Sequence, residues 1–137
     1  MALAYTSFVS QIITKAAPSH NAESTSVEKD LGANTLVQGL WLYTTIAANG
    51  LSGSPNAGGR IVVNLYPRGA TVSGSNHSDD VVHSFAHAVT KDGAYSFADY
   101  CPGTLPRFIA VGVKNLTGKQ VATTGLNLSI ECIKTTG

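Results

Sequence analysis

Gly125-Leu-Asn-Leu-Ser-Ile-Glu-Cys-Ile-Lys134, near the end of the chain, contains the clearest structural pattern in the sequence. Apolar residues alternate with polar ones: Leu126, Leu128, Ile130 and Cys132 occupy one parity, and Asn127, Ser129 and Glu131 the other. Alternation with period two is typical of a β-strand that turns one face toward a core and the other toward solvent. The segment therefore predicts a strand that carries Cys132 into the interior.

The same alternation recurs along the chain. It is clear in residues 108–114, 61–67 and 36–48, and weaker in residues 5–14, 26–31, 81–90 and 94–98. Turn residues separate these runs, in three loops at 48–59, 68–80 and 100–106 and in Lys91-Asp92-Gly93, where Asp-Gly favours a hairpin. No segment keeps a helical period, so we predict an all-β fold: a two-sheet antiparallel β-sandwich, in the form of a jelly roll of about eight strands.

Length and composition limit the class of protein. The chain has 137 residues, which fits one domain, with residues 1–17 as an N-terminal arm or first strand and residues 18–137 as a single β-sandwich domain. Charged residues make up 12% of the chain and the net charge is +1, which disfavours a nucleic-acid partner. No apolar run approaches the ~18 residues of a membrane helix, and the 43% hydrophobic content is too high for a disordered chain.

Signatures of catalysis and of cofactor binding are missing from the sequence. Gly50-Leu-Ser-Gly-Ser misses the nucleophile elbow by one position, and Gly112 to Gln120 imitates a phosphate-binding loop with wrong spacing and no helix after it. Potential metal ligands gather only in residues 77–87. If that segment is a strand, His83 and His87 lie about 13 Å apart, too far to share one zinc ion. We therefore predict no enzyme, no cofactor and no metal, and assign these histidines to a surface or an interface.

The cysteines and the N-terminus indicate the compartment. Cys101 and Cys132 form no Cys-x-x-Cys pair, which favours two buried reduced thiols over a disulfide. The sequence starts with Met and shows no secretion signal, so we expect synthesis and use inside a cell. The sequons at Asn76, Asn115 and Asn127 then have no role in glycosylation.

On three of the predicted strands, large apolar side chains also occupy alternate positions that should point away from the core. They are Trp41, Tyr43, Val62, Tyr66 and Phe108. The outer face of a sandwich strand should be polar, so other polypeptide is expected to cover these side chains. The cover can come from the same chain or from a protein partner, and we take the five as candidate protein-interface residues. A carbohydrate platform built from Trp41 and Tyr43 is a further alternative.

Three stretches resemble a known class of proteins: Ser26-Val-Glu-Lys-Asp-Leu-Gly-Ala33, Asn56-Ala-Gly-Gly-Arg-Ile-Val-Val-Asn-Leu-Tyr66 and Pro106-Arg-Phe-Ile-Ala-Val-Gly-Val-Lys-Asn-Leu-Thr-Gly118. In style and length the chain is similar to the small jelly-roll capsid cement, or decoration, proteins of tailed bacteriophages. The resemblance implies a structural virion protein that binds the outer face of the major capsid shell and stabilises it. It implies no catalytic residues.

The expected partners are the major capsid protein and further copies of the chain, as a dimer or trimer. The expected location is the capsid surface of a virion, after synthesis in the host cytoplasm. The N-terminal arm and residues 48–59 and 68–80 are candidates for the contacts, and deleting residues 1–17 should abolish shell binding if the arm is the tether. Two alternatives stay open: another phage structural component, such as a tail, fibre or head-completion protein, and a carbohydrate-binding β-sandwich module.

Overall fold

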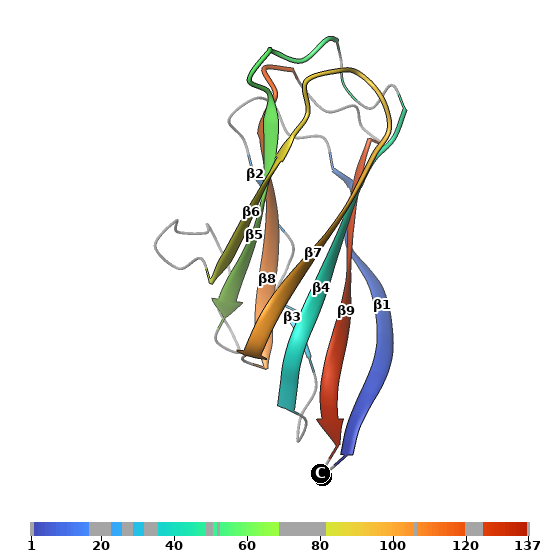
Figure 1. Cartoon of the computed structure of the whole chain (residues 1–137), viewed down its shortest axis with the longest axis vertical. Coiled ribbons are helices and arrows are strands. Elements are labelled where there is room, and N and C mark those ends of the chain that lie inside the picture. The colour runs from blue at the N-terminus through green and yellow to red at the C-terminus, as the bar shows by residue number, and fades with distance from the viewer. Residues whose placement is uncertain are drawn as a thin grey trace.

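The computed structural model describes residues 2–16, 23–25, 29–31, 36–48, 51, 53–68, 82–105, 107–119 and 125–136. These residues form strands and no helix (Figure 1): β1 (Ala2–Ala16), β2 (Glu23–Thr25), β3 (Lys29–Asp30), β4 (Leu36–Ile46), β5 (Arg60–Arg68), β6 (His83–Ala88), β7 (Tyr95–Leu105), β8 (Phe108–Leu116) and β9 (Leu126–Thr136). Within the same ranges, no helix is long and apolar enough to cross a membrane.

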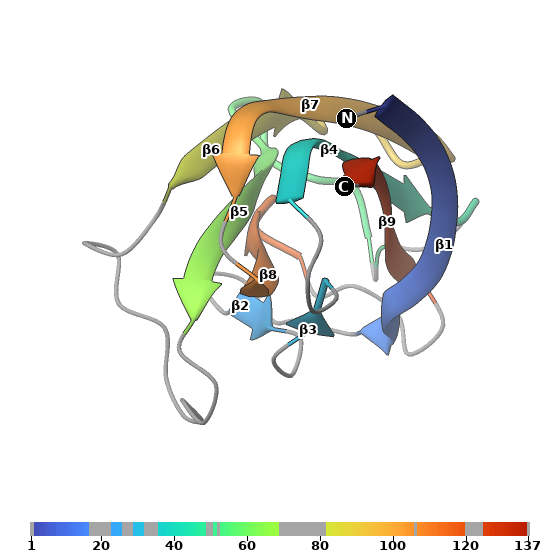
Figure 2. The ribbon, with the colours of Figure 1, turned by 90° about the horizontal axis from the view of Figure 1, so that it is seen from below.

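The strands form two antiparallel sheets that face each other (Figures 1 and 2). One sheet has the order β1-β9-β4-β7, and the other has the order β2-β8-β5-β6, with β3 also paired to β8. The pairs are nested: β1 pairs with β9, β2 and β3 with β8, β4 with β7, and β5 with β6. This nesting is the jelly-roll topology, so the predicted fold class is confirmed. The short strands β2 and β3 pair with opposite ends of β8 and share one place in the sheet, which leaves eight places for nine strands.

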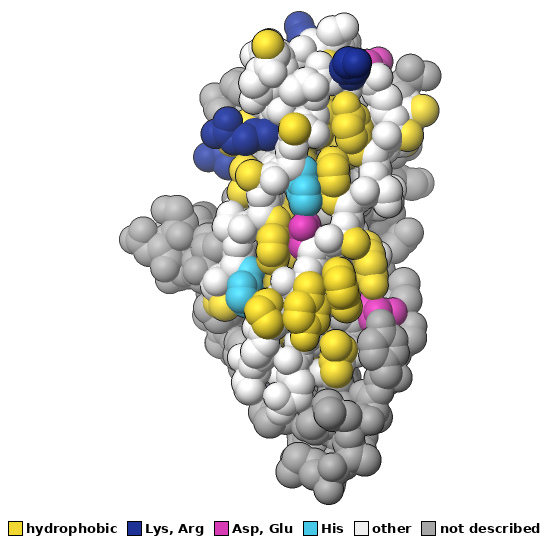
Figure 3. All heavy atoms as spheres, in the orientation of Figure 1, with side chains coloured by type: hydrophobic (Ala, Val, Ile, Leu, Met, Phe, Trp, Pro, Cys, Tyr) yellow, Lys and Arg dark blue, Asp and Glu magenta, His cyan; other side chains and the backbone are white. Residues whose placement is uncertain are grey.

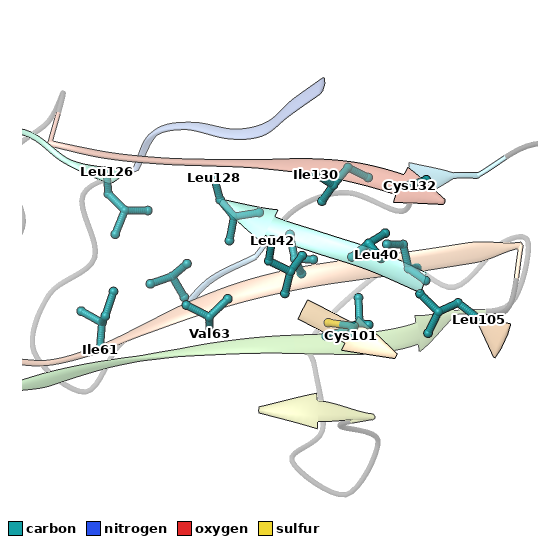
Figure 4. Packing of buried hydrophobic residues seen from close by; sticks show 14 of the residues in the cluster. Leu40, Leu42, Ile61, Val63, Cys101, Leu105, Leu126, Leu128, Ile130 and Cys132 are labelled. Carbon is teal, nitrogen blue, oxygen red and sulfur yellow. The ribbon is translucent and has the colours of Figure 1, made fainter. Parts of the chain in front are cut away.

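The core lies between the two sheets, where the alternation placed it. Leu126, Leu128, Ile130 and Cys132 follow one another along β9 and are fully buried. Figure 4 shows them with Leu40 and Leu42 of β4, facing Ile61 and Val63 of β5 across the interior. Removal of this apolar surface from water is the main favourable contribution to folding of the domain.

Strand β7 corrects one expectation. The sequence predicted a strand over residues 94–98 and a loop over 100–106, yet β7 runs without a break from Tyr95 to Leu105 and contains Pro102. A proline lacks the N–H that a central strand must donate, but β7 is the edge strand of its sheet and has a neighbour on one side only. Pro102 therefore fits within the strand.

Proline did not end β5 either. Pro67 was expected to stop the strand, and β5 continues to Arg68. Beyond Leu65, β5 pairs with β8 alone, because its ladder with β6 ends there. The missing N–H is tolerated where one neighbour is absent.

The Asp92-Gly93 turn also differs from its expected role. It was predicted to join a hairpin, but β6 pairs with β5 in one sheet and β7 pairs with β4 in the other. The turn therefore carries the chain from one sheet to the other. Asp-Gly specifies local backbone geometry, whereas the pairing of the flanking strands depends on which partner completes each sheet.

The two thiols are free and buried, in agreement with the expected reduced state. Both lie in register with Leu40, Cys101 on the β7 side and Cys132 on the β9 side. Two strand spacings separate them, about 9.6 Å, and disulfide geometry requires Cα atoms within about 7 Å. The strand order therefore keeps the thiols apart.

The sequon at Asn115 lies inside the fold. Asn115 and Thr117 are fully buried, and the Asn115 side-chain amide donates to the carbonyl of Lys119. The side-chain oxygen of Asn115 accepts from the backbone N–H and the hydroxyl of Thr117. The amide nitrogen is committed to a structural turn, so this site does not accept a glycan in the folded protein. Asn76 lies outside the described residues.

Candidate functional site: an aromatic sheet face

The outer face of the β1-β9-β4-β7 sheet carries a row of three large side chains. Trp41 of β4 lies in register with Tyr100 of β7 on one side and with Glu131 of β9 on the other. The Trp41 and Tyr100 ring centroids are 5.0 Å apart, with the ring planes tilted by 46°. Contacts of this kind between aromatic cross-strand neighbours stabilise a sheet and also present a continuous apolar surface.

Tyr43 extends the row along β4. Its ring is nearly parallel to that of Trp41, with 6.2 Å between centroids. Its hydroxyl donates to Oε1 of Glu131 at 3.1 Å. Partial burial and the Glu131 carboxylate, in that order, raise the pKa of the Tyr43 hydroxyl above its ordinary value, so it stays protonated and remains a donor. We call Trp41, Tyr43, Tyr100 and Glu131 the aromatic face.

The surface around the aromatic face changes from apolar to polar along the strands. In register order, the rows across β7, β4 and β9 are Pro102–Gly39–Ile133, Tyr100–Trp41–Glu131, Ala98–Tyr43–Ser129 and Ser96–Thr45–Asn127. Glu131 is the only charged residue in these four rows. The four rows therefore combine aromatic surface with small, neutral side chains and a single carboxylate.

The aromatic side chains of the aromatic face differ in their exposure to solvent. Tyr100 is 38% exposed, and Trp41 and Tyr43 are half-buried. In the view of Figure 3, hydrophobic side chains occur along the length of the molecule together with two His side chains, and the Lys and Arg side chains visible in this view lie in its upper part. Part of each of the three aromatic rings is therefore accessible to solvent.

The structure separates the five interface residues that the sequence singled out. Trp41 and Tyr43 share the aromatic face, whereas Val62, Tyr66 and Phe108 belong to the opposite sheet, on β5 and β8. Tyr66 is only 2% exposed, so its cover is part of the same chain and it offers no surface to a partner. Phe108 is half-buried beneath the guanidinium of Arg107, which lies 4.8 Å from the ring centroid and is held by Asp30. The five side chains do not form one surface.

Tyr100 is the member that sequence reasoning missed. It lies in the segment 100–106, for which the two prolines Pro102 and Pro106 favour a loop. The signal that could have found it is parity: Tyr95, Phe97, Asp99 and Cys101 alternate with Ser96, Ala98 and Tyr100, which extends the strand and turns Tyr100 outward.

A second cluster lies where the edges of the two sheets meet (Figure 2). His87 of β6 and Asp99 of β7 form a hydrogen bond, with 2.8 Å between Nε2 and Oδ2. The His87 ring is also stacked on Phe97, with 4.1 Å between centroids. These contacts connect β6 to β7 across the open side of the sandwich, and we call them the edge cluster.

The edge cluster lacks a competent nucleophile. Cys101 is next to it in sequence, but burial, followed by the charge of Asp99, raises the pKa of its thiol to about 12. A thiol with this pKa is not ionised near neutral pH and does not attack a substrate. No group of three or more His, Cys, Asp or Glu side chains in the described part of the chain could hold a metal ion. Residues 77–80, part of the sequence cluster of metal-ligand types, lie outside that part.

Of the loops proposed as contacts, residues 69–80 lie outside the described residues. In the 48–59 loop, Leu51 is buried in the core. The backbone N–H of Asn56 donates to the carbonyl of Thr117, which ties this loop to the end of β8. Residues 2–16 form β1, which pairs with β9.

Comparison with known proteins gives no family. No protein-family model matches the chain, and no curated protein matches it. A family GH115 4-O-methyl-alpha-glucuronidase matches at 10% identity and a TM-score of 0.43, over 87% of this chain and only 14% of that one. A mitogen derived from Yersinia pseudotuberculosis matches at 13% identity and a TM-score of 0.39, over 93% of this chain and 86% of that one. The coat protein of Tobacco streak virus matches at 11% identity and a TM-score of 0.47, over 96% of this chain and 87% of that one. These similarities are too low to bear on function.

Proposed function

We propose that this protein is a structural protein of a virion, a capsid cement or decoration protein that binds the outside of the major capsid shell through its aromatic face. The observation that carries the proposal is the cluster of Trp41, Tyr43 and Tyr100 on the outer surface of a sheet, where a free sandwich would have polar side chains. Tryptophan and tyrosine are, with arginine, the residues most enriched among energetic anchors of protein interfaces.

The low charge of the chain supports the same proposal. Charged residues are 12% of the sequence, and Glu131 alone is charged in the four register rows around Trp41. A neutral surface is a liability for a protein that is free at high concentration, but it is suitable for a subunit that remains bound in an array. Many weak contacts on one shell, made by a dimer or trimer, add up to firm attachment through effective concentration.

The protein would stabilise the capsid shell by physical contact alone. A subunit that bridges neighbouring capsomers adds contact area, and this area must be separated before the shell opens. The aromatic face would supply the central apolar contact, and the polar row of Ser96, Thr45 and Asn127 would lie at its rim. The protein would act on the virion surface after synthesis in the host cytoplasm.

Co-sedimentation with empty shells, assembled from the major capsid protein of the same genome, tests the proposal. We expect saturable binding, with affinity reduced at least about tenfold by Trp41→Ala, the effect of losing an interface anchor. Thr45→Ala is the matched control: Thr45 is exposed on the same strand, at the rim of the proposed contact, where truncation should change the affinity little. Trp41 is the only tryptophan of the chain, so its fluorescence should shift to shorter wavelength on binding. Shells that bind no protein, or bind Trp41→Ala as tightly as wild type, would reject the proposal.

A carbohydrate-binding module is the second candidate, and one observation favours it. The carboxylate of Glu131 and the hydroxyl of Tyr43 lie beside the Trp41 ring, so an apolar ring surface and hydrogen-bonding groups occur together. A glycan array distinguishes the two functions. Binding of a defined glycan that is lost in Trp41→Ala, together with no binding to shells, would replace the virion function with this one.

A further inference from the structure

Gly39 occupies an unusual position on the aromatic face. It lies on β4 two residues before Trp41, on the outward side of the sheet, yet it is buried. The register of β4 with both neighbours is interrupted between Val37 and Gly39. Against β9 the extra residue is Gln38 of β4, whereas against β7 the extra residue is on β7, between Pro102 and Leu105. Such a bulge redirects the strand, and here it lies directly before Gly39.

The ring of Tyr100 is what covers Gly39. A Cβ atom built on Gly39 would lie 2.5 Å from Oη of Tyr100 and 3.1 Å from both Cε1 and Cζ. These contacts are closer than side chains tolerate, so only glycine leaves room for the ring in this position. The constraint is one of space, because the backbone of Gly39 is not in the left-handed region.

The same placement brings Tyr100 against Trp41. The ring crosses from β7 toward β4, over Gly39, and reaches 5.0 Å from the Trp41 centroid. Tyr100 is nevertheless 38% exposed, so the ring packs against Trp41 and remains accessible to a partner. An aromatic side chain fixed before binding loses little conformational freedom when a partner arrives, which raises affinity.

We propose that Gly39 is the positioning residue of the aromatic face: by lacking a side chain it lets Tyr100 lie over β4 and against Trp41, and so forms the surface that a partner binds. The binding consequence rests on the proposed function. The positioning itself is a property of the free protein and can be tested without a partner.

Quenching of Trp41 fluorescence by acrylamide is the test, since the chain has a single tryptophan. We expect Tyr100→Ala to raise the quenching constant roughly twofold by uncovering Trp41, and Gly39→Ala to raise it as much by displacing the Tyr100 ring. If Gly39 acts through Tyr100, the double variant Gly39→Ala/Tyr100→Ala should quench no more than Tyr100→Ala alone, a non-additive result expected for residues in contact.

Gly58→Ala and Gly93→Ala are the controls, because a Cβ at either glycine meets no atom within 4 Å. Both should leave the quenching of Trp41 at the wild-type value. The melting temperature of Gly39→Ala should stay close to theirs, because the displaced group is the end of an exposed side chain.

Two results would overturn the inference: unchanged quenching in Gly39→Ala, or an equal increase from Gly39→Ala in the wild-type and Tyr100→Ala backgrounds. If Gly39→Ala fails to fold, the double variant Gly39→Ala/Tyr100→Ala decides, because removal of the Tyr100 ring makes room for the added Cβ. Recovery of a cooperative melt in the double variant would support the inference, and failure of the double variant to fold would overturn it. On shells, both single variants should lose affinity by the same factor, about tenfold. If shells did not bind the wild-type protein, the proposed function would be rejected, but the conclusion from the quenching experiment would not be affected.

Discussion

Cys101 shows how a single residue is controlled by its surroundings. Its side chain is fully buried, and burial together with the charge of Asp99 raises the pKa of its thiol from 9.0 to about 12. We expect the native protein to react with a thiol-specific disulfide reagent at pH 8 no faster than it unfolds, because the thiolate is the reactive form. Absorbance of the released thiol measures the rate, and both cysteines should react at once in denaturant. Rapid labelling without denaturant would contradict the burial of Cys101.

The same pKa determines how stability depends on pH. The folded state holds the Cys101 proton more tightly than the unfolded state, so this thiol contributes stability below pH 9 that is lost as the pH rises from about 9 to about 12. The raised pKa of Tyr43 acts in the same direction. Urea unfolding at pH 7, 9 and 10.5 should therefore show a falling free energy of unfolding, with a smaller fall in Cys101→Ala. Stability that increases over this range would contradict the assignment.

At the scale of single elements, β6 and β7 depend on the edge cluster. Asp99 is 7% exposed, and its carboxylate bonds to His87 at 2.8 Å, so one side chain connects the edge strands of two sheets. Asp99→Ala leaves His87 without this partner, and loss of such a bond should lower the free energy of unfolding by about 1–3 kcal/mol. Chemical denaturation measures the change. Asp92→Ala is the control because Asp92 is exposed in the β6–β7 turn. If both variants lowered the free energy of unfolding equally, the bond between Asp99 and His87 would have no special role in stability.

The strands differ in how far the sequence alone predicts them. The alternation in β9 and in β4 predicted which side chains are buried, because burial on one face of a strand leaves a period of two in the sequence. The extent of β7 was missed because Pro102 is read locally as a break, and only the sheet order shows that its strand lies at an edge. For the same reason the sequence predicts only half of the aromatic face: Trp41 and Tyr43 lie on a strand that the alternation predicts, whereas Tyr100 lies on the part of β7 for which the sequence predicts a loop.

At the scale of the whole molecule, the strand order depends on pairings between distant parts of the chain. Ala2 lies opposite Thr136, so the first and last strands are neighbours, and the other pairs are nested inside them. Alternation identifies strands but contains no information on their partners, which explains why the Asp92-Gly93 turn was predicted to join a hairpin. The placement of Val62, Tyr66 and Phe108 on the sheet opposite Trp41 follows from the nesting and could not be derived from parity.

The pairing of the first strand with the last also changes how a deletion of residues 1–17 must be interpreted. Loss of shell binding after deletion of residues 1–17 was expected to identify a tether, but residues 2–16 are β1, the strand that covers one edge of β9. β9 contributes Leu126, Leu128 and Ile130 to the core, and without β1 its backbone donors and acceptors are open to other chains. We expect the truncated chain to aggregate or to lose cooperative unfolding, as measured by size-exclusion chromatography and thermal melting, so that any loss of shell binding follows from loss of the fold. A soluble truncated monomer that melts cooperatively near the wild-type temperature would show instead that β1 is a dispensable appendage, and the tether would again be testable by deletion.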